Sequence, residues 1–505
     1  MTFYITTPIY YVNDNPHVGH AYTTIACDIL SRFNLLNGED VYFLTGTDEH
    51  GQKVEKAANN ASTDPQTFVN KISENFKNII PFLGCNINDF IRTTEKRHIN
   101  AAQYLWKQLE KNNQIYLSNY EGWYSIRDES YYSETELIKD GDNNLAPTGS
   151  PVEWVKEESY FFKLSEWQDK LISHYESNTD LISPKSKYNE VLSFIKGGLK
   201  DLSISRTTFK WGIPVPNNKN HVMYVWIDAL CNYLTAIGYP NFNDESFKKY
   251  WPGIHVVGKD ILKFHAVYWP AFLMAAGIEP PKKIFAHGWW TNEGQKISKS
   301  TGNIIDPYEI INEYGLDQIR YFLFREVPFG NDGDFSKNAI STRINADLSN
   351  NYGNLVQRIA TFIVKNCNSK VTISFKLNQE DKKLTDFYEL KFNEYKKHMC
   401  NFKIDKSIKS IFELLSETNT YVDFQAPWSL KNKDLDRMNT VLFLISTIII
   451  KSSIMLFPII PNSAEKTLKI FNIDFKKINF KNIDEIIKND INVNKPEQIF
   501  PRIEK

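Results

Sequence analysis

Two histidines lie three residues apart near the start of the chain, in the stretch "TTPIYYVNDNPHVGHAYT". His17 and His20 flank Gly19, where a short apolar run, "FYIT", gives way to a helical pattern. At such a strand-to-helix turn, free backbone N–H groups and the helix dipole attract anions. Gly19 would let a bulky ligand approach the backbone closely. The motif predicts a phosphate-binding turn, and two ordinary surface or core histidines are the alternative.

A second group of polar residues lies far along the chain, in "WWTNEGQKISKSTGN". Lys296 and Lys299 enclose Ser298, Ser300 follows, and glycines flank the group. A solvated basic loop is the simpler interpretation. Mobile cationic donors of this kind nevertheless suit a triphosphate, whose charge shifts as a bond breaks. Together, the two motifs predict a nucleotide-using enzyme.

Composition limits the alternatives. A chain of 505 residues is long enough for two to four domains. Its net charge of −1 offers no global attraction for nucleic acid, so any RNA contact must come from local patches. The five cysteines include no CxxC pair, which favours a reducing cytosol over a disulfide framework or a thiolate zinc site. A strand pattern begins by residue 3, so we expect no signal or transit peptide.

One segment, 441–460, resembles a membrane span: "VLFLISTIIIKSSIMLFPII". Lys451 lies near its middle, and a lysine at the centre of a bilayer is costly. The segment also ends at prolines. We therefore predict a buried helix of a bundle, no membrane partner and a cytoplasmic protein.

Hydrophobic patterns divide the chain into regions. Strand and helix patterns alternate over 1–115 and again over 222–275, which predicts the two halves of a parallel, doubly wound α/β sheet. Between them, 116–221 is turn-rich and aromatic, like a β-containing insert. The lysine loop falls in 276–340, and the periodicity of 341–505 is helical throughout.

These motifs resemble those of class I aminoacyl-tRNA synthetases, specifically the bacterial methionyl-tRNA synthetases. The resemblance covers nearly the whole chain through "PIYYVNDNPHVGH", "FLTGTDEHGQK", "YVWIDAL", "GKDILKFHAVYWPA", "KISKSTGN" and "QAPW". The signature HIGH appears as HVGH at 17–20, and KMSKS appears as KISKS at 296–300. The resemblance implies a split Rossmann-type fold with a connective insert (116–221), a KMSKS-loop and stem-contact region (276–340), and an all-α anticodon-binding bundle (341–505).

The family's reaction is then expected here. The carboxylate of L-methionine attacks the α-phosphorus of ATP, pyrophosphate leaves, and methionyl-adenylate passes its methionyl group to the 3′ end of tRNA(Met) for protein synthesis, including initiation. Magnesium is expected to accompany ATP. Histidines and lysines would stabilise the charge that develops on the phosphates. The resemblance assigns catalysis to His17, His20, Lys296 and Lys299, and ATP binding to these residues with Gly19, Asp260 and Ser298.

The methionine pocket follows from the same resemblance. Asp48, in "GTDEHG", matches the carboxylate that holds the substrate ammonium. A polarisable thioether suits an aromatic-lined slot, although each aromatic residue is otherwise plain core. The side-chain pocket would comprise Ile9, Tyr11, Trp226, Ala229, Tyr233, Ile261, His265 and Trp269.

The helical region carries the expected tRNA contacts. Asn354 and Arg358 are four residues apart and share one helix face. Trp428 follows Pro427 at a helix end, which would present its ring to solvent; burial in the core is the alternative. These residues match those with which the family reads the CAU anticodon, and loop bases are read by stacking and edge hydrogen bonds.

Two features differ from many relatives. The insert has no cysteine where relatives carry zinc-binding CxxC pairs, and it is small for an editing domain. The sequence ends with "QIFPRIEK", where some relatives continue into a dimerisation domain. We therefore expect a zinc-free monomer.

Three other functions compete. A small nucleotidylyltransferase shares HxGH but lacks the KISKS loop and the helical third. A class I synthetase for cysteine or leucine shares both motifs, but "PIYYVN" and "QAPW" disfavour it. A catalytically inactive RNA-binding paralogue is disfavoured because both motifs are intact.

Overall fold

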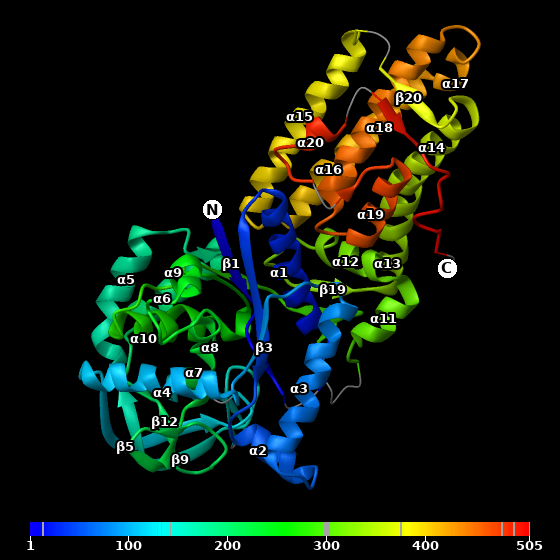
Figure 1. The fold of residues 1–505 in the computed structure, drawn as a ribbon. Helices are drawn as coiled ribbons and strands as arrows, with labels where there is room; N and C mark the ends of the chain where they lie inside the picture. Colours follow the sequence, from blue (N-terminus) through cyan, green and yellow to red (C-terminus); the bar gives the residue numbers. More distant parts are fainter. Residues whose placement is uncertain are drawn as a thin grey trace.

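A seven-stranded parallel sheet organises the N-terminal part of the computed structural model (Figure 1). The strand order is β10-β16-β15-β1-β3-β2, with β4 also paired to β3. The strands are β1 (Thr2–Thr6), β2 (Tyr10–Tyr11), β3 (Asp40–Asp48), β4 (Asp89–Arg92), β10 (Ile182–Ser183), β15 (Ile254–Gly258) and β16 (Lys283–His287). The structure describes residues 1–12, 15–128, 130–132, 134–141, 143–296, 303–373, 376–475, 478–487 and 490–503.

The direction of strand addition reverses at the centre of this sheet, between β1 and β15. Strand β1 pairs in parallel with both β3 and β15, so that Ile5 lies beside Phe43 on one side and Ile254 on the other. The chain leaves β1 toward β3 and leaves β15 toward β16, in opposite directions. Ligands of doubly wound sheets bind at such a switch point, outside the carboxyl ends of the strands.

Helices cover both faces of the sheet (Figure 1). On one side, α1 (Val18–Leu36) and α3 (Pro65–Phe82) share a hydrophobic core with the C-terminal bundle. Most of α1 is buried because it lies between the sheet and the bundle. A second core unites the sheet with the helices of the other side. These are α4 (Lys96–Lys111), α7 (Val225–Leu230), α8 (Asn232–Thr235) and α10 (Trp269–Ala275), while α2 (Gln52–Asn60) and α9 (Glu245–Tyr250) lie at the periphery.

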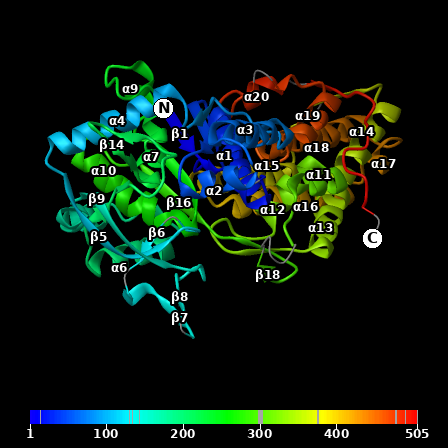
Figure 2. The same ribbon diagram turned by 90° about the horizontal axis from the view of Figure 1, so that it is seen from below.

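The insert is built on two long antiparallel strands, β5 (Ile115–Ser125) and β9 (Glu153–Phe162). A hairpin of β7 (Ile138–Asp140) and β8 (Asn143–Leu145) projects from it (Figure 2). The other elements are β6 (Ser130–Tyr132), η1 (Glu134–Glu136), η2 (Leu164–Trp167), α5 (Gln168–Ser177), α6 (Lys185–Lys196), β11 (Leu202–Ser203), β12 (Ser205–Arg206), β13 (Pro214–Val215) and β14 (Asn218–Met223).

One strand of this region differs from the sequence prediction. Residues 182–183 fall inside the predicted insert, but as β10 they form the edge of the main parallel sheet, with Ile182 beside Ile284. A two-residue strand is too short to show a periodic pattern, so pairing with β16 alone reveals it.

A small sheet and three helices connect the seven-stranded sheet to the bundle. Strand β17 (Trp290–Asn292) pairs with β18 (Gln295–Lys296) and with β19 (Gly333–Phe335). The helices α11 (Pro307–Tyr314), α12 (Leu316–Arg325) and α13 (Lys337–Arg343) follow. Arg320 of α12 is fully buried and donates to Asp28 of α1 at 2.6 Å and to the carbonyls of Pro458 and Ile459 in the bundle, so it ties the two parts together.

The C-terminal bundle is helical, as predicted, but it also contains a strand pair. Strands β20 (Lys370–Thr372) and β21 (Asp490–Asn492) are antiparallel, which the helical periodicity did not predict. Among the described residues, the helices are η6 (Ile344–Gly353), α14 (Asn354–Asn366), α15 (Gln379–Cys400), α16 (Ile404–Gln425), α17 (Pro427–Leu430), α18 (Leu435–Leu456), α19 (Pro461–Ile470) and α20 (Ile483–Ile486).

Helix α18 is the membrane-like segment. It is long and apolar enough to cross a bilayer, yet 83% of its most apolar stretch is buried inside the protein. Lys451 pairs with Asp484 at 2.6 Å, and its ammonium lies 4.2 Å from the centre of the Tyr388 ring. The prediction of a buried bundle helix is confirmed.

Candidate active site

The two histidines of the HVGH motif cap the first turn of α1. His17 is the N-cap residue: its Nδ1 accepts the backbone N–H of Gly19 at 3.1 Å. The backbone N–H of His17 in turn donates to Nδ1 of His20, also at 3.1 Å. A neutral imidazole that accepts at Nδ1 must carry its proton on Nε2. Each ring therefore retains an Nε2–H donor.

Burial favours the uncharged form of both rings. It lowers the pKa of His17, which the nearby Asp260 carboxylate opposes. Burial and the neighbouring His17 lower the pKa of His20 well below its ordinary value. A Cβ on Gly19 would lie 2.9 Å from Cε1 of His17, so glycine is what allows the His17 ring to fold back over the turn. The turn thus presents two neutral donors of fixed orientation.

Asp260 lies across the switch point, in η3 (Lys259–Ile261), directly after β15. The indole Nε1–H of Trp289 donates to its Oδ1 at 3.1 Å. Lys259 pairs with Asp332 at 2.6 Å, and its ammonium lies 4.4 Å from the centre of the Trp289 ring. The exposed Asp260 carboxylate is therefore supported from the small sheet that precedes the bundle.

The lysine loop is placed in part. Strand β18 ends at Lys296, whose backbone pairs with Thr291. Ser298, Lys299 and Ser300 lie outside the described residues. Their contribution to the site stays a prediction.

A second cluster forms around His265, in the π-helical segment η4 (Phe264–Tyr268). The Tyr233 hydroxyl lies 2.7 Å from Nε2 of His265, and Nδ1 lies 3.0 Å from the carbonyl oxygen of Ile261. The carbonyl can only accept, so Nδ1 carries the proton and Nε2 accepts from Tyr233. Burial lowers the pKa of His265 to about 4, which keeps the ring neutral.

Aromatic stacking shapes this cluster. The Trp226 ring stacks on Phe264, with centroids 3.8 Å apart and planes 9° from parallel, and it meets His265 edge to face at 6.1 Å. Its buried Nε1–H has no hydrogen-bond partner among the described residues. Trp269 is fully buried, and its Nε1–H donates to Nε2 of His255 at 3.3 Å. Trp269 is thus part of the core behind Tyr233, whose ring it meets at 6.2 Å.

The remaining predicted pocket residues come from the ends of β2 and β3 and from α7. Asp48 ends β3 and is buried, and Tyr11 of β2 lies beside it in register. The Tyr11 hydroxyl donates to the carbonyl of His50 at 2.9 Å. Ile9 is half-buried before β2, and Ala229 is buried in α7.

Sequence reasoning missed a buried carboxylate that joins these elements. Asp228 accepts from Nδ1 of His50 and from Nε2 of His98, each at 2.7 Å. Burial raises the pKa of Asp228, but the two imidazoles more than offset this and lower it to about 2. The bond to His50 ties the end of β3, with Asp48, to α7, with Trp226. A lone acid inside the apolar run "VWIDAL" was the available signal.

Two of the three predicted tRNA-contacting residues, Arg358 and Trp428, lie close together in the bundle. Asn354 is exposed at the start of α14, one turn before Arg358. The guanidinium of Arg358 bonds Asp423 and Asn419, each at 3.1 Å, and lies 6.0 Å from the centre of the Trp428 ring. Trp428 is 46% exposed, in the first turn of α17. The solvent-exposed indole ring of Trp428 therefore lies beside a guanidinium that is held in place by hydrogen bonds.

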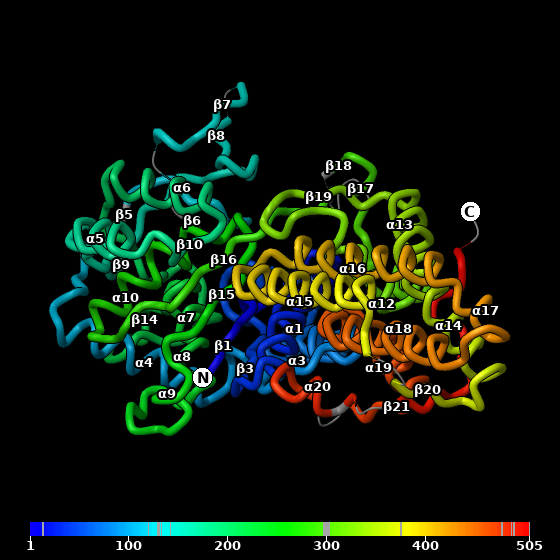
Figure 3. The backbone as a smooth tube through the Cα atoms, turned by 90° about the horizontal axis from the view of Figure 1, so that it is seen from above, coloured from blue at the N-terminus to red at the C-terminus, as the bar shows by residue number. Residues whose placement is uncertain are grey.

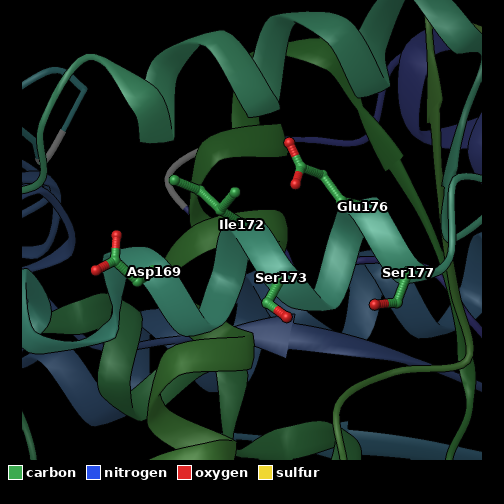
Figure 4. Close-up of a pocket in the computed structure, with 5 residues that line it drawn as sticks. All are labelled: Asp169, Ile172, Ser173, Glu176 and Ser177. Atoms are coloured by element: carbon green, nitrogen blue, oxygen red, sulfur yellow. The ribbon is translucent and has the colours of Figure 1, made fainter.

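A shallow hollow elsewhere is unrelated to these residues. One face of α5 lines it, as Figure 4 shows, and none of the predicted site residues is among its lining side chains. The lining residues are Asp169, Ile172, Ser173, Glu176 and Ser177.

Two family profiles cover most of the chain. Residues 3–360 match "tRNA synthetases class I (M)", and residues 373–505 match the "anticodon binding domain of methionyl tRNA ligase".

Relatives of known name match this chain along nearly its full length. The chain is 53% identical to the methionine–tRNA ligase of Rickettsia conorii over 514 aligned residues, covering 100% of this chain and 99% of the relative. It is 48% identical to that of Mesorhizobium japonicum, covering 99% and 97%. The methionyl-tRNA synthetase of Mycobacterium tuberculosis in complex with methionyl-adenylate superposes with a TM-score of 0.97 at 43% identity, covering 99% of this chain and 100% of that one.

Proposed function

The chain belongs to the class I methionyl-tRNA synthetases, and from this premise we propose which of its residues carry each part of the reaction. It is a methionine–tRNA ligase that uses ATP to activate methionine and then transfers it to tRNA. The observation that carries this conclusion is the match to methionine–tRNA ligases along the whole chain. We assign 1–115 and 222–275 to the catalytic domain, 116–221 to the connective insert, 276–340 to the stem-contact region and 341–505 to the anticodon-binding domain.

His17 and His20 act in the first step. The methionine carboxylate attacks the α-phosphorus, the bond to the bridging oxygen breaks, and pyrophosphate leaves. Negative charge grows on the phosphate oxygens as this happens. Two Nε2–H donors held by the helix cap stabilise that charge with little reorganisation, which is the most effective form of electrostatic catalysis. Since both rings are neutral donors, they need not lose or gain a proton during the step.

The rest of the ATP site surrounds this turn. Gly19 leaves room for the phosphates beside the backbone, and Asp260 accepts from the ribose hydroxyls. Lys296, Ser298 and Lys299 bind the leaving pyrophosphate. Magnesium arrives with ATP and neutralises part of the phosphate charge.

The methionine pocket lies between the strand ends and the aromatic cluster. Asp48 pairs with the substrate ammonium, and the unpartnered indole N–H of Trp226 faces the amino acid. The thioether packs against aromatic ring edges, which its polarisable sulfur favours. The lining residues are Ile9, Tyr11, Trp226, Ala229, Tyr233, Ile261 and His265, and Trp269 supports Tyr233 from the core behind it.

In the second step, the 3′-terminal ribose hydroxyl of tRNA(Met) attacks the activated carbonyl and AMP leaves. Asn354, Arg358 and Trp428 identify the tRNA at the anticodon, far from the chemistry. Their support is the exposed Trp428 ring beside the Arg358 guanidinium, an arrangement suited to stacking and hydrogen bonding of unpaired bases.

We further infer a cytoplasmic, monomeric enzyme that needs no zinc. Metal analysis of chelator-treated protein should find no stoichiometric zinc while activity is retained. Light scattering should give a mass near 58.8 kDa. One tightly bound zinc per chain, or a stable dimer, would contradict the respective part.

Amino-acid-dependent exchange of pyrophosphate into ATP tests the assignment as a whole. Methionine should support exchange, and cysteine and leucine should not. Exchange with either of those instead would indicate a different class I synthetase. Absence of exchange with every amino acid, with tRNA binding intact, would indicate an inactive RNA-binding paralogue.

A further inference from the structure

One carboxylate in the insert accepts hydrogen bonds from three hydroxyl groups, and its own backbone N–H binds a fourth. Oδ1 of Asp128 accepts from Ser150 at 2.9 Å, and Oδ2 accepts from Thr148 at 2.5 Å and from Tyr132 at 3.0 Å. The backbone N–H of Asp128 donates to Oγ of Ser125 at 3.2 Å. We call these five residues the Asp128 knot.

The knot lies at the base of the projecting hairpin. Ser125, Asp128 and Tyr132 precede β7, while Thr148 and Ser150 follow β8, so the carboxylate closes the loop at both ends. The hairpin projects from the same face of the molecule as the β17–β18 turn that leads into the KISKS motif (Figures 2 and 3). The knot therefore sets the position of an element on the active-site face.

The donor set of the knot does not fit zinc. Ser125 and Asp128 have the spacing of a CxxC pair, but they supply a hydroxyl and a carboxylate instead of thiolates. The hydroxyls of Tyr132, Thr148 and Ser150 already donate to the carboxylate oxygens, so they do not present free ligands to a cation. Among the described residues, no group of three histidine, cysteine, aspartate or glutamate side chains is arranged to hold a metal. Hydrogen bonds to Asp128 instead join the two ends of the loop.

The closed loop also contacts Lys263, in the segment that carries Ile261 and His265. The ammonium of Lys263 lies 5.7 Å from the centre of the Tyr132 ring and 3.9 Å from a carboxylate oxygen of Glu136, both within the loop. Lys263 stands between Ile261 and His265 in the sequence, and the next residue, Phe264, is stacked under Trp226. A shift of the loop would remove two partners of Lys263 and loosen the segment that supplies the pocket.

We propose that Asp128 is a positioning residue for methionine binding: it closes the insert without a metal and, through Tyr132 and Lys263, fixes the segment that carries Ile261 and His265. The inference rests on the proposed methionine pocket. It assigns to Asp128 no contact with the substrate.

The test compares Asp128→Ala with Asp140→Ala, an exposed carboxylate of the same hairpin. In pyrophosphate exchange, Asp128→Ala should raise KM for methionine about three- to tenfold while KM for ATP changes less than about twofold, since only amino-acid binding is loosened. Hydrogen–deuterium exchange of β7 and β8 should accelerate. Asp140→Ala should change neither property. Asp128→Asn, which keeps an acceptor oxygen for rotatable hydroxyls, should restore part of the affinity.

A double variant identifies the route. Lys263→Ala should reproduce the methionine effect, and Asp128→Ala combined with Lys263→Ala should add little to either alone, since both interrupt one chain of contacts. If Asp128→Ala does not fold, Asp128→Asn and Lys263→Ala replace it in the test.

Three outcomes would contradict these expectations. If the KM for methionine is unchanged in these variants but raised in Trp226→Ala, the inference about Asp128 is wrong and the assignment of the methionine pocket is retained. Unchanged KM in Trp226→Ala would overturn the pocket assignment itself. If added zinc restored the KM for methionine of the Asp128→Ala variant, the proposal that the insert closes without a metal would be overturned.

Discussion

The backbone of His17 holds the ring of His20 in place across one turn of helix. The backbone N–H of His17 donates to Nδ1 of His20 at 3.1 Å, and the two ring centroids are 3.9 Å apart. Since Nδ1 of His17 accepts from Gly19, both rings are fixed by backbone groups and not by long side chains. The two imidazoles thus accept two backbone N–H groups that would otherwise lack a partner at the start of the helix. We assign the same two residues to ATP binding.

Removing one donor tests this assignment. His20→Ala should lose about a hundred- to a thousandfold in the rate of pyrophosphate exchange, as is typical for a preorganised donor at developing charge. Methionine affinity, measured by equilibrium binding, should stay near wild type. Equal losses in both would place His20 in the amino-acid pocket instead.

The tautomers of the histidines form a second prediction. Nitrogen-15 NMR should find His17 and His20 with the proton on Nε2, because Nδ1 of each accepts a backbone N–H. His265 and His287, whose Nδ1 atoms contact the carbonyls of Ile261 and Gly288, should carry it on Nδ1. Because burial lowers the pKa of all four rings, these signals should persist as the pH falls from 7.5 to about 6.5, the ordinary pKa of histidine. Protonation of His20 near pH 6.5 would contradict the buried cap.

Gly19→Ala tests the geometry of the turn. The new Cβ would lie 2.9 Å from Cε1 of His17, so the ring must rotate out of its cap. A displacement of about 1 Å at a catalytic group is enough for a loss near a hundredfold in exchange rate. The melting temperature should change little, since helix α1 tolerates alanine. Wild-type exchange would show that the His17 position is not required.

Asp228→Asn addresses the buried link between β3 and α7. Removing the buried carboxylate to which His50 and His98 both donate should cost about 3 kcal/mol in the free energy of unfolding at pH 7, measured by urea denaturation. The folded pKa of about 2 lies below the ordinary value, so this stabilisation is present above about pH 4 and is lost as the pH falls toward 2. The difference between the two proteins should therefore shrink with acidification. A constant difference would mean that the Asp228 charge is not its source.

Trp428→Ala separates anticodon binding from chemistry. Loss of a stacking ring costs about 1–3 kcal/mol per base, so kcat/KM for aminoacylation should fall roughly five- to hundredfold. Pyrophosphate exchange without tRNA should be unaffected. Leu390→Ala, another exposed bulky residue of the bundle at 52% exposure, is the control and should change neither. If exchange and thermal stability fall together in Trp428→Ala, the ring is a structural residue.

The sequence by itself determined the parts of this protein that depend on neighbouring residues. The HVGH turn, the strand-helix alternation, the helical C-terminal region and the buried nature of α18 all have local signatures, because periodicity and capping act over a few residues. Family resemblance then connected the KISKS motif to the same reaction.

Only the tertiary structure decided which distant groups are partners. Asp228 meets His98 across 130 positions of the chain and His50 across 178, and Arg358 approaches Trp428 from another helix. The edge strand β10 and the β20–β21 pair are likewise defined by their partners. A hydrogen bond between such residues leaves no periodic trace in the sequence, since it depends on where the folded backbone brings each side chain. The role of a lone buried acid is therefore set by its neighbours in space.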